Sequence, residues 1–322
     1  MSAPLRNLLS LFAAIPLVAG SAFGWGCEGH QIIALIARAH LTPAASAAVD
    51  QLLRDNPIDP SIRRFCENRP ADLMADSATW ADDTRRAEKT GAWHYTDIPI
   101  TAHGGDSKRW CEPIGPSIDG KDRPGCVINA IELEWNVLKD PAQTSPAGAM
   151  ALRYLIHLIG DLSQPLHVGE NHDQGGNCTR MNFFFQERPE NLHAIWDSNI
   201  LHQDLTKQEA TQVQYAAMLD QRFSKHWHEW GESKPDVNAW VWQSQKRSAK
   251  VAYGKLKPPI PIASKTDGPA DPAACDAGRA LVESLHITIN DGYVDQALPV
   301  IREQLARAGY HLAGLLNQTF LR

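Results

Sequence analysis

Two histidine–aspartate pairs in this sequence have the spacing of one helical turn. His157 and Asp161 form the first pair, and His193 and Asp197 form the second. Side chains four residues apart on a helix lie on the same face, so each pair can bind one cation through a ring nitrogen and a carboxylate oxygen. A single pair of this kind is more often solvated or hydrogen-bonded. Two pairs in one chain favour a metal centre.

Further candidate ligands lie close to these pairs in the sequence. His167 follows Asp161 after Pro165, which ends the helix, so the returning chain can bring His167 alongside. Asp82 and His94 stand twelve residues apart in an earlier segment. Nitrogen and carboxylate ligands without thiolates suit catalytic zinc with open coordination positions. The other histidines fit no such pattern, and we interpret them as structural or surface residues.

The start of the chain adds a candidate of another kind. A basic residue, a short apolar stretch and small residues before Trp25 predict a signal peptide over residues 1–24. The apolar stretch is too short to span a bilayer. Cleavage makes Trp25 the N-terminus, whose amine and carbonyl oxygen can chelate one metal ion, with His30 as a third ligand.

Charge and cysteine content indicate the setting. Removal of residues 1–24, which contain one basic residue, leaves 30 basic and 37 acidic side chains, a balance of −7. The chain therefore lacks a global basic surface for duplex DNA. Six cysteines without a CxxC pair favour disulfides in an exported protein. We predict the pairs Cys27–Cys66, Cys111–Cys126 and Cys178–Cys275, although the sequence leaves other pairings open.

Helical periodicity dominates the chain. Helices are predicted over residues 28–41, 43–53, 71–86, 127–138, 146–162, 207–223 and 235–253, with two more between 276 and 320. One strand is predicted over 181–186, and a loop rich in Gly, Pro and Cys over 101–125. The helical pattern continues on both sides of every loop, so we predict one domain over residues 25–322.

The combined motifs resemble those of the S1/P1 nuclease family, secreted zinc nucleases related to the bacterial zinc phospholipases C. The motifs are Trp25-Gly-x-x-Gly-His30, Trp80-Ala-Asp82, His94-Tyr-Thr-Asp97, His157-x3-Asp161-x3-Pro-Leu-His167, Gly-Gly-Asn177 and Asn191-Leu-His193-x2-Trp-Asp197. The resemblance implies a mainly α-helical, single-domain fold of the phospholipase C/P1 nuclease type, with a short β-hairpin and loops held by disulfides.

The resemblance also implies nine ligands for three zinc ions. The first ion is assigned to Asp82, His94, His157 and Asp161. The second is assigned to His167, His193 and Asp197. The third is assigned to Trp25 and His30, with Asp161 bridging it to the first.

The implied activity is hydrolysis of single-stranded RNA and DNA to 5′-phosphate products, together with 3′-nucleotidase activity. Two zinc ions about 3.5–4 Å apart can share a water and bring its pKa near neutrality. We expect a hydroxide between the first and third ions, oriented by Asp82, to attack phosphorus in line. Arg85, one turn after Asp82, is expected to neutralise charge on the phosphate oxygens. The alternative for Arg85 is an ordinary surface ion pair.

Base binding is assigned to three residues by the resemblance. Tyr95 is the stacking platform, Asp97 accepts a hydrogen bond from the base edge, and Asn177 makes a second edge contact. The family more commonly has Phe where Tyr95 stands, which leaves base preference open. Phe183 to Phe185 offer either a second platform or part of the core, and the alternation of a strand favours the core.

Two other functions remain open at this stage. One is a zinc phospholipase C on the same scaffold, which typically has Glu where Asp197 stands. The other is a non-catalytic zinc-binding protein, although such proteins usually collect histidines in mobile tracts. For the nuclease we expect a secreted or periplasmic monomer with no membrane span and no stable protein partner.

Overall fold

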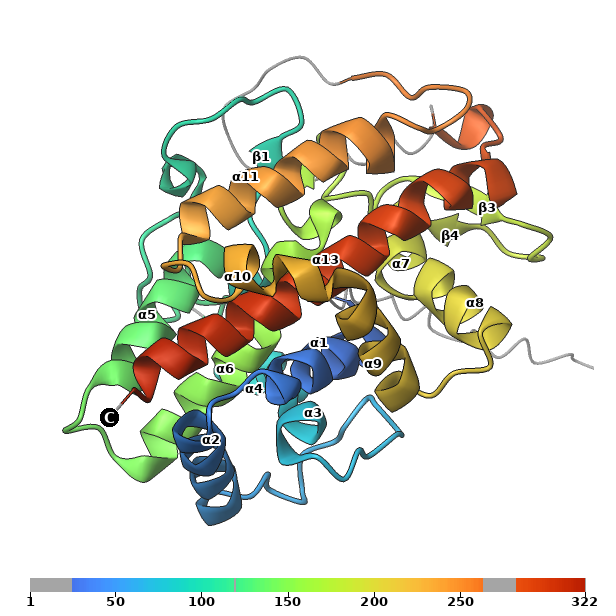
Figure 1. The fold of residues 1–322 in the computed structure, drawn as a ribbon. Helices are drawn as coiled ribbons and strands as arrows, with labels where there is room; N and C mark the ends of the chain where they lie inside the picture. The colour runs from blue at the N-terminus through green and yellow to red at the C-terminus, as the bar shows by residue number, and fades with distance from the viewer. Residues whose placement is uncertain (1–24, 119, 263–281, 322) are drawn as a thin grey trace, which may run out of the picture.

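The chain is mainly α-helical, as predicted. The structure is a computed structural model that describes residues 25–118, 120–262 and 282–321 (Figure 1). Its α-helices are α1 (Cys27–Ala39), α2 (Pro43–Asp55), α3 (Leu73–Ser77), α4 (Trp80–Glu88), α5 (Val127–Lys139), α6 (Ser145–Ser163), α7 (Leu192–Ala194), α8 (Ile200–Lys207), α9 (Gln212–Phe223), α10 (Trp227–Trp230), α11 (Val237–Arg247) and α13 (Asp291–Thr319). Short 3-10 turns cover Gly91–His94, Ser107–Trp110, Pro165–His167 and Ser224–His226, and π-helical turns cover Ile195–Asn199 and Ser248–Tyr253.

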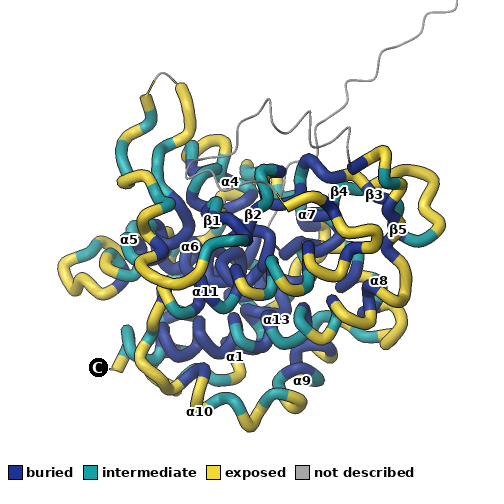
Figure 2. Tube along the Cα trace, turned by 90° about the horizontal axis from the view of Figure 1, so that it is seen from above, coloured by how far each residue is buried: buried dark blue, intermediate teal, exposed yellow. Residues whose placement is uncertain are grey.

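The longest helices enclose one hydrophobic core. α13 runs along the length of the molecule and packs on α1 and α6, while α5 covers another side of α6 (Figure 1). Ile33 of α1, Leu155 of α6 and Leu312 of α13 are all fully buried. Figure 2 shows these helices as a buried centre with exposed loops around it. Buried side chains of the helices join in one cluster, in agreement with the predicted single-domain fold.

Two predicted helices were wrong in their extent, and a capping box inside the helical pattern explains one of the two differences. The segment 71–86 is divided into α3 and α4 at residues 78–79, with Asp72 capping α3 by accepting a hydrogen bond from the Ala75 amide. The segment 207–223 begins only at Gln212, where Thr211 and Gln214 form a reciprocal capping box. Residues 200–207 form a separate helix, α8, which was not predicted.

The C-terminal prediction of two helices falls partly outside the described residues. Within them, a single long helix, α13, accounts for Asp291–Thr319.

Short strands bring distant segments together. β1 (Ile98–Pro99) pairs in parallel with β2 (Gly169–Glu170). β3 (Arg180–Phe183) lies between antiparallel β4 (Glu190–Asn191) and parallel β5 (Thr288–Ile289). The hairpin of β3 and β4 confirms the predicted β-hairpin, although β3 ends earlier than predicted because Phe184 turns away with φ of 52°. Phe183 is buried, as the core interpretation requires, whereas Phe185 is fully exposed.

Two of the three predicted disulfides are confirmed. Cys27 is bonded to Cys66, and Cys111 to Cys126. The third predicted pair includes Cys275, which lies outside the described residues, as does the predicted signal peptide over 1–24. Among the helices that are described, none combines the length and apolar character needed to cross a membrane.

Candidate metal centre

Eight of the nine predicted ligands bring their side chains into one buried cluster, which we call the metal cluster. Helices and turns far apart in sequence supply them, namely His30 of α1, Asp82 of α4, His94 of a 3-10 turn, His157 and Asp161 of α6, His167 of a second 3-10 turn, His193 of α7 and Asp197 of a π-helical turn. None of the eight side chains is more than 5% exposed. The sequence placed these residues in local pairs, and the fold joins the pairs.

The metal cluster contains three groups that could each hold an ion. The groups are His30, His157 and Asp161; Asp82, His94 and His157; and His167, His193 and Asp197. Within each group, the ligand atoms lie within 4.8 Å of one another. The last group is the ligand set predicted for the second ion. The first two groups share His157, which was predicted for the first ion only, and the number of bound ions stays a prediction.

Asp161 joins the first two groups. Its Oδ1 lies 3.3 Å from Nε2 of His30, and its Oδ2 lies 3.1 Å from Nε2 of His157 and 2.9 Å from Nδ1 of His94. Asp82 approaches the same rings, 3.6 Å from His94 and 3.8 Å from His157. Asp161 is therefore the carboxylate that both groups can share.

The third group lies beside the first two. Nε2 of His193 is 3.3 Å from Oδ2 of Asp197, four residues later, as the predicted helical pair requires. His167 contributes from the other side, with Nε2 3.9 Å from Oδ1 of Asp197. Nδ1 of His167 is also 3.8 Å from Asp161, so the third group adjoins the shared carboxylate.

Unpaired ligand atoms show that these side chains fit metal ions. Both oxygens of Asp82, Oδ1 of Asp161 and Nε2 of His30, His94, His167 and His193 are buried and have no hydrogen-bond partner among the described residues. A buried polar atom without a partner is unfavourable unless a ligand satisfies it. Imidazole nitrogens and carboxylate oxygens are ligands of divalent metals such as zinc.

Backbone carbonyls hold three of the rings in a ligand orientation. Nδ1 of His157 donates to the carbonyl of Ala78 (2.8 Å), Nδ1 of His167 to that of His94 (2.7 Å) and Nδ1 of His193 to that of Gly175 (2.6 Å). Donation from Nδ1 fixes the tautomer and directs Nε2 toward the metal cluster. Ala78 lies in the break between α3 and α4, and its carbonyl accepts the hydrogen bond from His157.

Burial and neighbouring charges set the protonation of the metal cluster. Burial lowers the pKa of His30 to about 4 and that of His193 to about 3, so both rings are neutral at pH 7. Burial also disfavours charged His157, but Asp161 and Asp82 outweigh it and raise its pKa to about 9. Although burial raises the pKa of Asp161, His157 and His167 hold it well below its usual range. A carboxylate field that favours a proton on His157 also favours a metal cation.

Trp25, the ninth predicted ligand, lies next to the metal cluster. Its side chain is fully buried, and its indole N–H donates to Oγ of Ser163 over 2.7 Å. The next amide, that of Gly26, donates to the carbonyl of Asp197 over 2.9 Å. These contacts place the predicted mature N-terminus between α6 and the third group. That its amine and carbonyl oxygen bind a metal stays a prediction.

The predicted catalytic and base-binding residues lie close to the same centre in the fold. Arg85 is on the same face of α4 as Asp82, with NH1 3.6 Å from Oδ1. Tyr95 follows His94 directly, and its side chain is 44% exposed. Burial, with the nearby Asp173, raises the pKa of Asp97 to about 6. Asn177 is half-buried and donates to the Gln174 carbonyl over 2.8 Å.

Sequence reasoning missed several residues that support the ligands. Gln164 donates from its amide to Asp197 and accepts from the Leu166 amide over 2.6 Å, which fixes the turn that carries His167. Gly175 has φ of 58°, and a Cβ there would overlap with the Leu166 carbonyl oxygen. A Gly-Gly dipeptide signals a positive φ, but only the fold shows that its carbonyl holds His193.

Fold and site together define a helical protein built around a buried centre that can hold metal ions. The chain belongs to the S1/P1 nuclease family: the family model described as S1/P1 Nuclease matches residues 25–321. Nucleases cleave phosphodiester bonds, so the chain is a phosphodiesterase.

Curated relatives agree with this assignment. The chain is 27% identical to "Nuclease S1" of Aspergillus oryzae over 322 residues, which covers 97% of each protein. It is 29% identical to "Endonuclease 2" of Arabidopsis thaliana, over 92% of this chain and 91% of the relative. It is 27% identical to "Nuclease P1" of Penicillium citrinum, over 91% of this chain and 97% of the relative.

Proposed function

We propose that this chain is an exported zinc-dependent nuclease that hydrolyses single-stranded RNA and DNA to 5′-phosphate products and also acts on 3′-nucleotides. The observation that carries the proposal is the metal cluster, in which seven of the buried ligand atoms named above lack hydrogen-bond partners among the described residues. Histidine and carboxylate ligands without thiolates are typical of catalytic zinc sites. The relatives named as nucleases and endonucleases support a nucleic-acid substrate.

We assign the ligands to three zinc ions as the family resemblance implies. Asp82, His94, His157 and Asp161 hold the first ion. His167, His193 and Asp197 hold the second. His30 and the N-terminal amine and carbonyl oxygen of Trp25 hold the third, with Asp161 between the first and third.

The chain's own side chains prepare the reaction. When bound, zinc supplies Lewis acidity and lowers the pKa of water towards neutrality. Both oxygens of Asp82 lack hydrogen-bond partners among the described residues, and Asp82 accepts a hydrogen bond from the attacking water and orients it. Arg85, 3.6 Å from Asp82, neutralises charge that develops on the phosphate oxygens.

Base binding next to the metal cluster explains a preference for single strands. Tyr95 offers an exposed ring beside His94 for stacking, and Asp97 and Asn177 bind the base edge. A base must leave its stack to reach this place, which costs a few kcal/mol in a duplex and much less in a single strand. The 3′-phosphate of a single nucleotide fits the same arrangement.

Export is supported by the disulfides Cys27–Cys66 and Cys111–Cys126, which are typical of proteins outside the reducing cytosol. We propose cleavage of a signal peptide before Trp25, with the nuclease-like domain over residues 25–322 acting as a monomer in the periplasm or outside the cell.

Zinc content and hydrolysis, measured on protein that begins at Trp25, test the proposal. We expect close to three zinc ions per chain, cleavage of single-stranded RNA that EDTA abolishes, and product ends with 5′-phosphate. Faster hydrolysis of phosphatidylcholine than of RNA would instead indicate a phospholipase C. Tight binding of zinc without any phosphoesterase activity would indicate a non-catalytic zinc-binding protein. Absence of zinc would contradict the proposal.

A further inference from the structure

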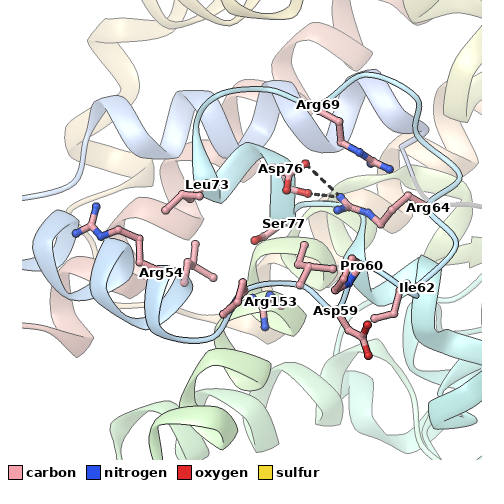
Figure 3. A pocket seen from close by; sticks show the side chains of 13 residues that line it. Arg54, Asp59, Pro60, Ile62, Arg64, Arg69, Leu73, Asp76, Ser77 and Arg153 are labelled. Atoms are coloured by element: carbon pink, nitrogen blue, oxygen red, sulfur yellow. Dashed lines mark hydrogen bonds and ion pairs between the residues drawn. The ribbon is translucent and has the colours of Figure 1, made fainter.

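A second polar site lies apart from the metal cluster. A cavity of about 560 Å³ lies between the C-terminal end of α2, the loop over residues 57–64, and α3 (Figure 3). None of the metal-cluster residues lines it. Its charged lining consists of Arg54, Arg64, Arg69 and Arg153 with Asp59 and Asp76. Arginines thus outnumber carboxylates two to one, in a chain whose overall charge is negative.

Arg153 is the residue that points to a ligand. Only 6% of it is exposed, and its guanidinium donates one hydrogen bond, to the Asn56 carbonyl. Its Nε has no hydrogen-bond partner, and no carboxylate among the described residues lies within ion-pair distance of it. Two weaker interactions act on Arg153: its guanidinium carbon lies 5.7 Å from the centre of the Trp80 ring, and the charge of Asp76 favours its charged form. A buried guanidinium without a directly paired carboxylate is nevertheless unfavourable.

No carboxylate among the described residues is directly paired with Arg153. Arg64 is similarly buried, but it is paired with Asp83 at 2.6 Å and with Asp76 at 3.5 Å. Asp59 is exposed and accepts a hydrogen bond from the Ser61 amide, 2.8 Å away. Burial and the charge of Arg64 lower the pKa of Arg153 by more than the charge of Asp76 raises it, so the two guanidinium groups repel each other. An anion between them removes that repulsion.

We propose that this cavity binds a phosphate group through Arg153 and Arg64, either as free phosphate or as a phosphate of a nucleic-acid strand. The planar guanidinium groups donate paired hydrogen bonds that match phosphate oxygens. This site is additional to the metal centre, and its binding test does not require the proposed nuclease activity.

The cavity also adjoins elements that orient a metal ligand. Arg153 precedes His157 by one turn of α6. Ser77, in the cavity lining, precedes Ala78, whose carbonyl accepts from Nδ1 of His157. The cavity lining is therefore connected to His157 through α6 and through the end of α3.

Calorimetric titration with inorganic phosphate tests the site on the zinc-loaded full chain. The variants are Arg153→Met and, as a matched control, Arg63→Met, which removes an exposed charge from the same loop but does not line the cavity. We expect wild type and Arg63→Met to show a binding event that survives EDTA treatment, and Arg153→Met to weaken that event at least about tenfold. An EDTA-resistant event of equal affinity in Arg153→Met, or none in wild type, overturns the proposal.

A second variant covers the case in which Arg153→Met does not fold. Arg69→Met removes an exposed arginine of the same lining and is expected to weaken EDTA-resistant phosphate binding about threefold, because peripheral charges act through screened attraction. Unchanged affinity in Arg69→Met then contradicts the proposal.

Hydrolysis separates the two phosphate sources once binding is established. If a strand phosphate occupies the cavity, Arg153→Met raises KM for long single-stranded RNA and not for a dinucleotide. If free phosphate occupies it, both KM values stay at the wild-type level while EDTA-resistant phosphate binding is still lost. Both results support the site.

Discussion

Nδ1 of His94 and Nε2 of His157 lie 3.0 Å apart inside the protein, although 63 residues separate them in sequence. Oδ2 of Asp161 completes a triangle with these two nitrogens, at 2.9 and 3.1 Å. Two ring nitrogens at this distance repel through their lone pairs unless a cation or a proton lies between them. The folded state therefore depends on what occupies the triangle.

Metal removal is expected to destabilise the protein, and more so at high pH. In metal-free protein a proton on His157 must replace the cation. Because the folded pKa of His157, about 9, lies above the usual value of about 6.5, its stabilisation is present below pH 6.5 and is lost as pH rises through 9. The folded pKa values of His30 and His193 are lowered, so these rings are neutral in both the folded and the unfolded protein above pH 6.5. Their contribution to stability therefore does not change in this window.

Thermal unfolding of zinc-loaded and EDTA-treated protein at pH 6.5 and pH 9 measures this effect. The Tm difference between the two forms should widen at pH 9. Other buried groups that titrate here, such as Glu170 with a pKa near 8, act in both forms and largely cancel. Equal Tm values with and without EDTA at both pH values would contradict a metal-dependent cluster.

The glycine that orients His193 provides a second prediction. Gly175→Ala introduces a Cβ against the Leu166 carbonyl oxygen at a backbone position with φ of 58°. The carbonyl that holds Nδ1 of His193 must then move, so we expect zinc content to fall and kcat to drop at least about tenfold. Gly104→Ala is the control, because Gly104 has a similar φ of 61° with open space around it. It should cost only about 1 kcal/mol of stability. Full activity in Gly175→Ala would show that the position of this carbonyl is not needed for the metal site.

The mature N-terminus is tested by extending it. One extra residue before Trp25 converts the amine into an amide, which is a far weaker ligand, and adds volume where the Trp25 side chain is fully buried. We expect the extended protein to lose about one zinc ion per chain and most of its activity. Proteolytic removal of the extra residue should restore both. An extended chain with full zinc content and activity would refute an N-terminal ligand.

The sequence predicted the local parts of this site well, and the reasons are physical. His157 with Asp161 and His193 with Asp197 could be found because residues four apart share a helix face. The approach of His94 to Asp161 depends on how two distant elements pack, and only the family resemblance implied it. The periodicity likewise predicted where helices occur, but it did not predict the break at residues 78–79, because apolar spacing continues through it.

Supporting groups were beyond the reach of sequence patterns. Gln164 looks like an ordinary polar residue at a helix end, and its contact with Asp197 appears only once the two segments meet. The same holds for Ser163, whose hydroxyl oxygen accepts a hydrogen bond from the indole N–H of Trp25. A side chain that only hydrogen-bonds to another side chain has no characteristic spacing in the sequence, whereas the ligands of one metal ion often do.

Tyr95 provides the last test, because it separates base binding from metal binding. Its carbonyl accepts from the Val127 amide over 3.0 Å, which fixes the backbone while 44% of the residue remains exposed. Stacking contributes about 1–3 kcal/mol per base, so Tyr95→Ala should raise KM for single-stranded substrates about 5- to 150-fold with zinc content unchanged. Tyr95→Phe keeps the ring and should stay within about twofold of wild type, because stacking does not need the hydroxyl. A KM that Tyr95→Ala leaves unchanged on every nucleotide tested would show that bases bind elsewhere.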